Sequence, residues 1–354
     1  MRLNKSPSSW ASFVQDLDLF SCLNPHIPIN FDNLRNIPVT NILELKNNID
    51  ELKLEMTEKS ISALTSEING LVSAGGKKFR PGLMFLMGEV FNLNPADLKV
   101  YARAVELTHL ASLIHDDVID ESDKRRNHPT LNSLRNNTTA ILAGDFVLAT
   151  VMGELASANN NELLKDLTKC IQDLADGEWL QYDLKSKNEV SFGDLELVCI
   201  KKTGSLIRFC CTTPAKLSGH KDIKTMATLG ERIGLIFQMA DDIVDGFDQS
   251  GRPAFQDIIN GQFNYVTLQM MELYPELAEK LNAVKNGHLK ELPWSEEQYL
   301  HAVKEIHLKI NNEKNHLLTI FSNLCKNKNQ NHLIELFELS LNKIQNNYAN
   351  QLSL

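Results

Sequence analysis

The stretch ELTHLASLIHDDVID, residues 106–120, decides the fold. Its apolar side chains recur every three or four residues, which is the period of an amphipathic helix, and it ends on Asp116, Asp117 and Asp120. Positions i and i+4 of a helix share a face, so Asp116 and Asp120 are expected to lie together. Like charges at this spacing repel each other, and an unpaired carboxylate among apolar residues is costly. The pattern therefore predicts a helix that carries a site for a cation.

The same arrangement returns in FQMADDIVD, residues 237–245, with Asp241, Asp242 and Asp245. A single motif of this kind could be a solvated acidic turn, but two independent ones arise by chance in well under about one chain in a hundred. Magnesium prefers carboxylate oxygens and is typically completed by waters and substrate phosphates. The two motifs predict a site at which several Mg²⁺ ions hold a diphosphate.

Cationic residues flank both aspartate motifs. The segment GGKKFRP, residues 75–81, places two glycines before a basic cluster at the start of a helix, where backbone N–H groups favour an anion. Arg125 and Arg126 follow the first motif, and Lys202-Thr203 lies in a later helix. Each would be an ordinary surface residue by itself, but around two metal-binding motifs these cations are predicted to bind phosphate.

Most of the remaining sequence also has a helical period. Residues 1–41 contain Pro25, Pro28 and Pro38 and are predicted to be an irregular N-terminal extension. Residues 42–354 are predicted to form one large all-α domain, because strand-like alternation never persists and no linker or repeat divides them. One helix or a pair of helices is predicted over 42–56 and 61–71. Further helices are predicted at 97–120, 138–158, 162–185, 194–218 and 224–246, with a last one around 333–344.

Composition excludes several classes of protein. The 354 residues contain only 17 glycines and 11 prolines, which favours long helices over a sandwich or barrel. A net charge of −9 argues against a nucleic-acid partner. No apolar run is long enough for a spanning helix, and no secretory signal is evident. The six scattered cysteines are expected to be reduced thiols, so the cytoplasm is the expected location.

With these motifs, the chain resembles the trans-isoprenyl diphosphate synthases of the polyprenyl synthetase family, of the medium- or long-chain type. The resemblance covers roughly residues 45 to 345. It rests on the segments GGKKFRP (75–81), ELTHLASLIHDDVIDESDKRRNHPT (106–130), AGDFVLA (143–149), KTGSL (202–206) and FQMADDIVD (237–245).

The resemblance implies an all-α bundle around a deep central cavity, usually in a homodimer. It also implies a Mg²⁺-dependent prenyltransferase that joins isopentenyl diphosphate to an allylic diphosphate by ionisation, condensation and elimination. The product would be a longer all-trans prenyl diphosphate, and about three Mg²⁺ ions would be held when substrate is bound.

The family's functional residues carry over to matching positions of this sequence. Asp116, Asp120 and Asp241 would hold magnesium, with Asp117, Asp242 and Asp245 as supporting or water-mediated ligands. The residues that would bind the diphosphate of isopentenyl diphosphate are Lys77, Arg80, His109 and Arg126. The residues that would act on the allylic substrate are Arg125 and Lys202 at its diphosphate, and Thr203 and Gln238 at its developing cation.

The length of the product follows from the side chains beneath the first motif. Thr108, Ala111 and Ser112 precede Asp116 on or near its helix face, and none is aromatic. In the family, aromatic residues at the positions of Ala111 and Ser112 mark short products, so about twenty carbons or more are expected here. Trp179, in a segment resembling the family's GExxQ, either closes the tunnel lower down or fills core.

The departures from the family pattern follow the second motif. Arg252 stands where lysine is usual, Phe255 replaces a glycine, Gln262 falls where a second lysine is expected, and the segment FNYVTL lacks the family's proline. Arginine can grip phosphate but is not interchangeable with lysine, and glutamine supplies no charge.

Two alternatives to an active synthase remain. A non-catalytic subunit that modulates another synthase would fit the altered segment, but such subunits tend to lose aspartates, and all six are present. A class I terpene cyclase shares the fold and the first motif. It normally carries a different second motif, and it has no use for GGKKFRP.

Overall fold

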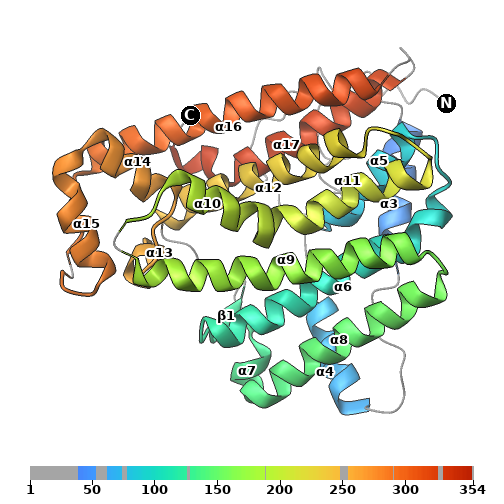
Figure 1. The fold of residues 1–354 in the computed structure, drawn as a ribbon, viewed down its shortest axis with the longest axis horizontal. Helices are drawn as coiled ribbons and strands as arrows, with labels where there is room; N and C mark the ends of the chain where they lie inside the picture. Colours follow the sequence, from blue (N-terminus) through green and yellow to red (C-terminus); the bar gives the residue numbers. More distant parts are fainter. Residues whose placement is uncertain are drawn as a thin grey trace. The chain divides into compact units, whose positions relative to one another are not determined.

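The computed structural model describes residues 39–52, 62–73, 78–125, 128–187, 189–247, 254–289, 291–325 and 330–352. Almost all of these residues are helical, and the single sheet among them is a two-stranded hairpin that pairs Lys124 with Pro129 and Arg125 with His128. The prediction of an all-α protein is therefore confirmed (Figure 1).

The first half of the described chain holds the elements around the first aspartate motif. They are α3 (Val39–Asp50), α4 (Ser62–Ser73), α5 (Phe79–Val90), α6 (Pro95–Ile119), β1 (Lys124–Arg125), β2 (His128–Pro129), α7 (Leu131–Leu134), α8 (Asn137–Ser157) and α9 (Asn161–Ser186).

The second half holds the elements around the second motif. They are α10 (Phe192–Cys199), the π-helical turn η1 (Ile200–Gly204), α11 (Ser205–Leu217), α12 (Ile223–Asp245), α13 (Gln256–Ile259), α14 (Tyr265–Leu273), the 3₁₀ turn η2 (Pro275–Leu277), α15 (Ala278–Lys285), α16 (Glu296–Leu324) and α17 (Asn331–Leu352).

The predicted helices agree closely with this order. The helix expected from residue 42 begins at Val39, and those expected at 97–120, 138–158, 162–185 and 224–246 correspond to α6, α8, α9 and α12. The helix expected over 194–218 is a composite of α10, η1 and α11. Helices α14, α15 and α16 were not predicted, and residues 1–38 of the expected extension lie outside the described residues.

The chain divides into two compact units. One contains residues up to Lys169 together with Phe209–Ala227 and Leu324–Phe337, and the other contains Cys170–Arg208, Thr228–Asn323 and Glu338–Leu354. The first unit holds the first aspartate motif, and the second holds the other motif with the lysine–threonine pair.

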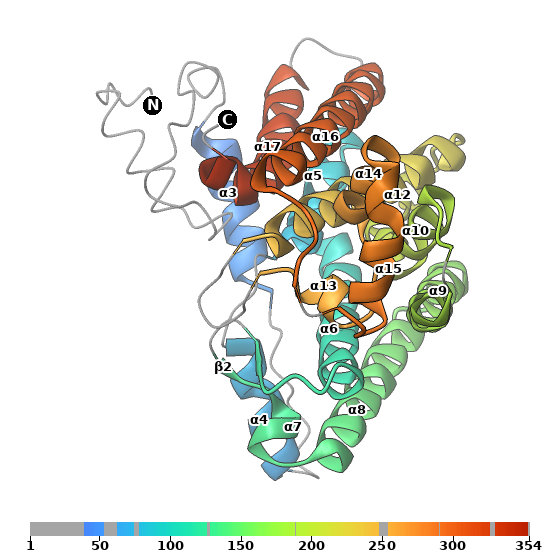
Figure 2. The same cartoon turned by 90° about the vertical axis from the view of Figure 1, so that its left-hand side faces the viewer.

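In the first unit, α6 and α8 lie side by side and form the main helix contact (Figure 2). A Cβ on Gly144 of α8 would meet the ring of His115 on α6, so glycine permits this close approach. Asn94 caps the N-terminus of α6 by accepting from the Ala96 N–H, and Pro95 occupies the first helical position. The buried face of α6 includes Ala104, Val105 and Leu107.

By length and composition alone, one helix of the described part, α8, could cross a membrane. Only 33% of its most apolar window is buried, and Ile141 and Leu142 are exposed. Many core helices of proteins that do not enter membranes meet the same criterion, so this is weak evidence for a span.

Candidate active site

The first aspartate motif lies at the C-terminal end of α6. Asp116 is half-buried in the last turn, whereas Asp120 is the exposed C-cap residue, and its N–H donates to the Asp116 carbonyl at 2.8 Å. The next residue, Glu121, takes a left-handed conformation (φ 49°) that ends the helix. The motif therefore presents Asp120 to solvent at a helix end.

Asp117, the middle member of this motif, is turned into the protein. Its Oδ1 accepts from Nε of Arg125 at 2.9 Å and contacts the Arg125 Nη2 at 2.8 Å. Burial raises the pKa of the Asp117 carboxyl, and the Arg125 guanidinium opposes that rise. The side chain of Asn132 donates to the Asp117 carbonyl. Asp117 thus ties the end of α6 to the β1–β2 hairpin through a cation.

The second motif, near the end of α12, has the same division between an exposed and a buried aspartate. Asp241 is exposed, but Asp242 is only 3% exposed and accepts two hydrogen bonds of 2.8 Å, from the backbone N–H of Tyr265 and from Nε2 of Gln238. Tyr265 is the first residue of α14, so Asp242 also lies at a helix N-terminus, which favours negative charge. Burial still raises the pKa of Asp242 well above its usual value, and the nearby Asp257 adds to the rise.

Asp245, the last residue of α12, is also buried and holds the following loop. Its carbonyl accepts from the N–H of Phe255 at 2.6 Å, and its Oδ2 accepts from the N–H of Asp257 at 3.3 Å. Phe255, at a position where the family has glycine, adopts a left-handed conformation with φ 61°. Its ring packs edge-on against Trp294 and Tyr299, and this packing offsets the backbone strain.

The predicted Lys202 and Thr203 lie in η1, a π-helical turn within an otherwise α-helical segment. A Cβ on Gly177 of α9 would come within 2.7 Å of the Lys202 nitrogen, and one on Gly234 of α12 would come within 2.5 Å of the Gly204 Cα. Turns of this kind are rare and often occur at functional sites. The two glycines let α9 and α12 pack directly against the turn.

Polar contacts also fix the turn. The Lys202 ammonium pairs with Glu178 and donates to Oε1 of Gln181 at 2.9 Å. The Thr203 hydroxyl contacts Oε1 of Gln238 at 3.4 Å, and Gln238 in turn donates to Asp242. The structure therefore brings together Lys202, Thr203, Gln238 and the second aspartate motif.

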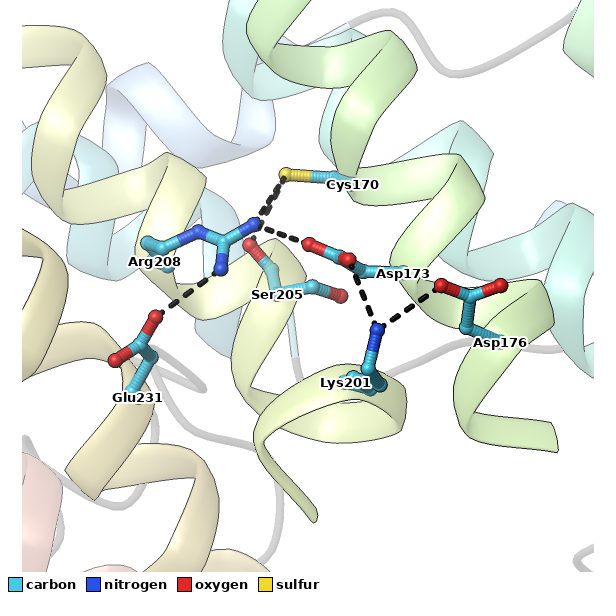
Figure 3. A network of polar contacts seen from close by, with 7 residues as sticks. All are labelled: Cys170, Asp173, Asp176, Lys201, Ser205, Arg208 and Glu231. Carbon is cyan, nitrogen blue, oxygen red and sulfur yellow. Dashed lines mark hydrogen bonds and ion pairs between the residues drawn. The ribbon is translucent and has the colours of Figure 1, made fainter. Parts of the chain in front are cut away.

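Next to this turn lies a charged network that the sequence did not reveal (Figure 3). Asp173 of α9, only 5% exposed, accepts from Nη2 of Arg208 at 2.6 Å and contacts the Lys201 ammonium at 3.5 Å. Arg208 also pairs with Glu231 at 3.1 Å, and Lys201 with Asp176 at 2.9 Å. The network joins α9, η1, α11 and α12 around the turn that carries Lys202.

The predicted ligands of the diphosphate of isopentenyl diphosphate are only partly described. Lys77 and Arg126 lie outside the described residues, as does Arg252, the arginine at a position where the family usually has lysine. Arg80, in the first turn of α5, and His109, in the middle of α6, are both half-buried.

The predicted chain-length residues on α6 differ in burial. Thr108 and Ala111 are buried, and Ser112 is half-buried, with its hydroxyl donating to the His109 carbonyl at 2.9 Å. The suggestion that Trp179 fills core is wrong, because its side chain is 70% exposed and stacks only at an angle on the exposed Tyr182. Trp179 lies one residue after Glu178 on α9. The residues of this part of α9 that contact η1 are instead Gly177, Glu178 and Gln181.

Sequence reasoning gave no role to Glu178 and Gln181, the two side chains that contact Lys202. It also missed the ion pair of Asp173 with Arg208 beside η1, and Asn264, which caps the N-terminus of α14. One signal was available, because Glu178 and Gln181 are three positions apart and so share a helix face. No comparable signal marks Asp173 or Arg208, which meet 35 residues apart in the chain.

The donor set of both motifs fits magnesium. Among the described residues, no three histidine, cysteine or acidic side chains gather closely enough to hold a metal ion by themselves. Each motif instead offers a small number of exposed carboxylate oxygens, such as those of Asp120 and Asp241, and such oxygens are hard ligands. Mg²⁺ commonly binds in this way, through one or two carboxylates with waters and substrate phosphates completing its shell.

Comparison with known proteins gives a consistent result. The chain is 33% identical over 263 residues to solanesyl diphosphate synthase 2 of Arabidopsis thaliana, covering 71% of this chain and 62% of that protein. It is 39% identical over 220 residues to a prenyl transferase of Synechocystis sp., covering 59% of this chain and 67% of that protein. The chain thus spans less than two thirds of the length of several curated relatives, among them the solanesyl diphosphate synthases of Arabidopsis and rice.

Solved structures share the fold. A decaprenyl diphosphate synthase from Rhodobacter capsulatus superposes with a TM-score of 0.74 at 20% identity, covering 86% of this chain and 98% of that one. A geranylgeranyl pyrophosphate synthase from Lactobacillus brevis gives 0.72 at 25% identity, covering 87% and 98%. The sequence model of the polyprenyl synthetase family matches residues 61–305. The chain therefore belongs to the polyprenyl synthetase family.

Proposed function

We propose that the protein is a trans-prenyltransferase that condenses isopentenyl diphosphate with an allylic diphosphate. The observation that carries the proposal is the shared construction of the two aspartate motifs. In each, the middle aspartate is buried and anchored, and an exposed carboxylate of the same helix, Asp120 or Asp241, is available at the surface to bind a cation and its diphosphate. Membership of the polyprenyl synthetase family supports this reading.

The residues around η1 suit the allylic substrate. Lys202 offers an ammonium for its diphosphate, while the oxygens of Thr203 and Gln238 offer negative partial charge to a developing allylic cation. Bound Mg²⁺ would supply the positive charge that balances the departing diphosphate. No nucleophilic side chain is required, and burial raises the pKa of the Cys199 and Cys211 thiols, which keeps both in the unreactive protonated form.

The side chains beneath the first motif support a product of about twenty carbons or more. The small residues Ala111 and Ser112 leave no ring to block a growing chain on this face of α6. Relatives named as solanesyl diphosphate synthases point the same way. Ser112→Phe is expected to shorten the product, as measured by sizing the prenyl chain after phosphatase treatment. An unchanged chain length would refute the role of this position.

A homodimer and a reducing compartment such as the cytoplasm complete the proposal. In the first unit the exposed apolar side chains Leu134, Ile141 and Leu142 belong to α7 and the start of α8, and a second copy could cover them. The described cysteines are all free thiols, which supports a reducing compartment.

The experiment that tests the proposal is incubation of the purified chain with Mg²⁺, isopentenyl diphosphate and a panel of allylic primers, followed by product sizing. A longer prenyl diphosphate is expected from the chain alone. Product formed only after a second protein is added would indicate a modulatory subunit instead. A cyclic hydrocarbon made without isopentenyl diphosphate would indicate a terpene cyclase.

A further inference from the structure

Gln262, the neutral residue at a position where the resemblance led us to expect lysine, lies at the end of a hydrogen-bonded chain that begins at Lys202. The Lys202 ammonium donates to Oε1 of Gln181 at 2.9 Å, and Nε2 of Gln181 donates to Oε1 of Gln262 at 2.6 Å. All three side chains are partly buried. The chain connects η1, α9 and the loop between α13 and α14.

The direction of these hydrogen bonds is fixed by chemistry. A lysine ammonium has only donors, so the Gln181 atom that faces Lys202 must be the carbonyl oxygen. The NH₂ group of Gln181 then points the other way, and the atom it meets on residue 262 must be an acceptor. The side-chain oxygen of Gln262 provides that acceptor. A lysine at this position would place its ammonium, a donor, against the NH₂ group of Gln181, which is also a donor.

Hydrogen bonds hold the backbone around Gln262 in place. Its N–H donates to the Asp257 carbonyl at 2.8 Å, and the preceding Gly261 supplies the left-handed conformation (φ 81°) that turns the chain. The side chain of Asn264 donates to Asp257 at 3.1 Å, and the Asp257 N–H donates to Asp245. The acceptor is therefore fixed relative to the second aspartate motif.

We propose that Gln262 is a positioning residue: by accepting from Gln181 it fixes the amide that directs the Lys202 ammonium toward the allylic diphosphate. The proposal rests on the proposed function, since it assigns the ligand of Lys202. Gln262 acts through Gln181 and contributes no charge to the substrate.

The test is a set of variants at this position. Gln262→Lys replaces the acceptor with a donor, and Gln262→Met removes the acceptor without adding charge. The double variant Gln181→Glu/Gln262→Lys restores an acceptor to both lysines. Asn260→Lys, at an exposed position of the same loop, is the matched control for added charge.

Binding of inorganic diphosphate with Mg²⁺ is measured for each variant by calorimetry, together with KM for the allylic substrate and for isopentenyl diphosphate. Gln262→Lys is expected to weaken diphosphate binding and raise the allylic KM about tenfold, and Gln262→Met about threefold to fivefold. The double variant is expected to return to within about threefold of wild type. Asn260→Lys and the KM for isopentenyl diphosphate are expected to change little.

Diphosphate binding that is unchanged or tighter in Gln262→Lys would overturn the proposal, because it would make residue 262 a site for substrate charge. Failure of the double variant to recover would overturn it as well. Unfolding measurements accompany each variant, and Gln262→Met provides the answer if Gln262→Lys does not fold. Wild-type protein that binds diphosphate in the expected pattern but forms no product would refute the proposed function and leave the role of Gln262 standing.

Discussion

The two aspartate motifs share a sequence pattern but are anchored in different ways. In the first, the buried Asp117 is balanced by a cation, the half-exposed Arg125. In the second, the donors that the described residues offer to the buried Asp242 are neutral, a backbone N–H at the start of α14 and the amide of Gln238. In each motif the middle aspartate thus has a structural role.

The two anchors differ in what happens to the hydrogen-bond donor when its aspartate is removed. Arg125 can turn to water if Asp117 is removed, because 38% of its side chain is exposed. The N–H of Tyr265 cannot do so, since that residue is buried at the beginning of a helix. A buried donor left without an acceptor costs more than a surface ion pair contributes. The second motif should therefore be the more fragile of the two.

The largest expected effect on turnover comes from Asp116 and Asp241, the aspartates predicted to hold magnesium. Asp116→Ala or Asp241→Ala should lower the turnover of isopentenyl diphosphate by a factor on the order of a thousand or more, because a bound Mg²⁺ would lose a ligand at the departing diphosphate. The free energy of unfolding should change by only about 0.5 kcal/mol. Radiolabelled product formation and chemical denaturation check the two parts. Retained turnover in either variant would contradict the metal assignment.

Substitution of the middle aspartates, Asp117 and Asp242, should lower the free energy of unfolding more than Asp116→Ala or Asp241→Ala does, and should lower turnover less. The two substitutions should also differ from each other in their effect on stability. Asp242→Ala is expected to lower the free energy of unfolding by about 2–3 kcal/mol, because the Tyr265 N–H and the Gln238 amide lose their acceptor in the interior. Asp117→Ala is expected to cost about 1 kcal/mol. Urea denaturation of the two variants side by side makes the comparison. Equal losses, or a larger loss for Asp117→Ala, would show that the neutral anchor is not the more fragile one.

The loop behind the second motif offers a smaller effect with a matched control. Phe255 is left-handed, and alanine at this position keeps the backbone strain while glycine relieves it. Both substitutions remove the ring from Trp294 and Tyr299, so both should destabilise the protein. Phe255→Gly is expected to be more stable than Phe255→Ala by about 1 kcal/mol. A Phe255→Ala variant as stable as Phe255→Gly would show that no strain is stored there.

The smallest effect concerns the ion pair of the first motif. A double-mutant cycle with Asp117→Asn and Arg125→Met should give a coupling free energy of about 0.5–1 kcal/mol. Raising the salt concentration should reduce that coupling, because the guanidinium is partly exposed. The corresponding cycle between Asp242→Asn and Gln238→Leu involves no cation and should respond less to salt. Identical salt responses in the two cycles would remove the distinction between the anchors.

The helices that carry the two motifs, and the spacing of the aspartates on them, could be predicted because both depend on residues close together in the chain. The spacing of Asp116 with Asp120 and of Asp241 with Asp245 follows from the helical repeat, and the limits of α6 and α12 were predicted to within two residues. Both patterns are visible within a few residues of the chain, so no tertiary information was needed.

The anchors could not be predicted in the same way. Asp242 meets Tyr265 23 residues later, and Lys202 meets Gln181 21 residues earlier. Such contacts depend on how helices pack, which periodicity does not specify. The π-helical turn is a further case, since Gly177 of α9 and Gly234 of α12 approach it closely from other parts of the chain.

The most direct test of the division between chemistry and fold compares two neighbouring residues of α12. Magnesium-dependent condensation and the free energy of unfolding would be measured on the same preparations of wild type, Asp241→Ala and Asp242→Asn. Asp241→Ala is expected to lose condensation and keep its stability. Asp242→Asn, which retains one acceptor oxygen for the Tyr265 N–H, should keep more than about a tenth of wild-type turnover. Wild-type turnover in Asp241→Ala, or complete loss of turnover in a fully folded Asp242→Asn, would contradict the assignment of Asp241 to catalysis and Asp242 to the fold.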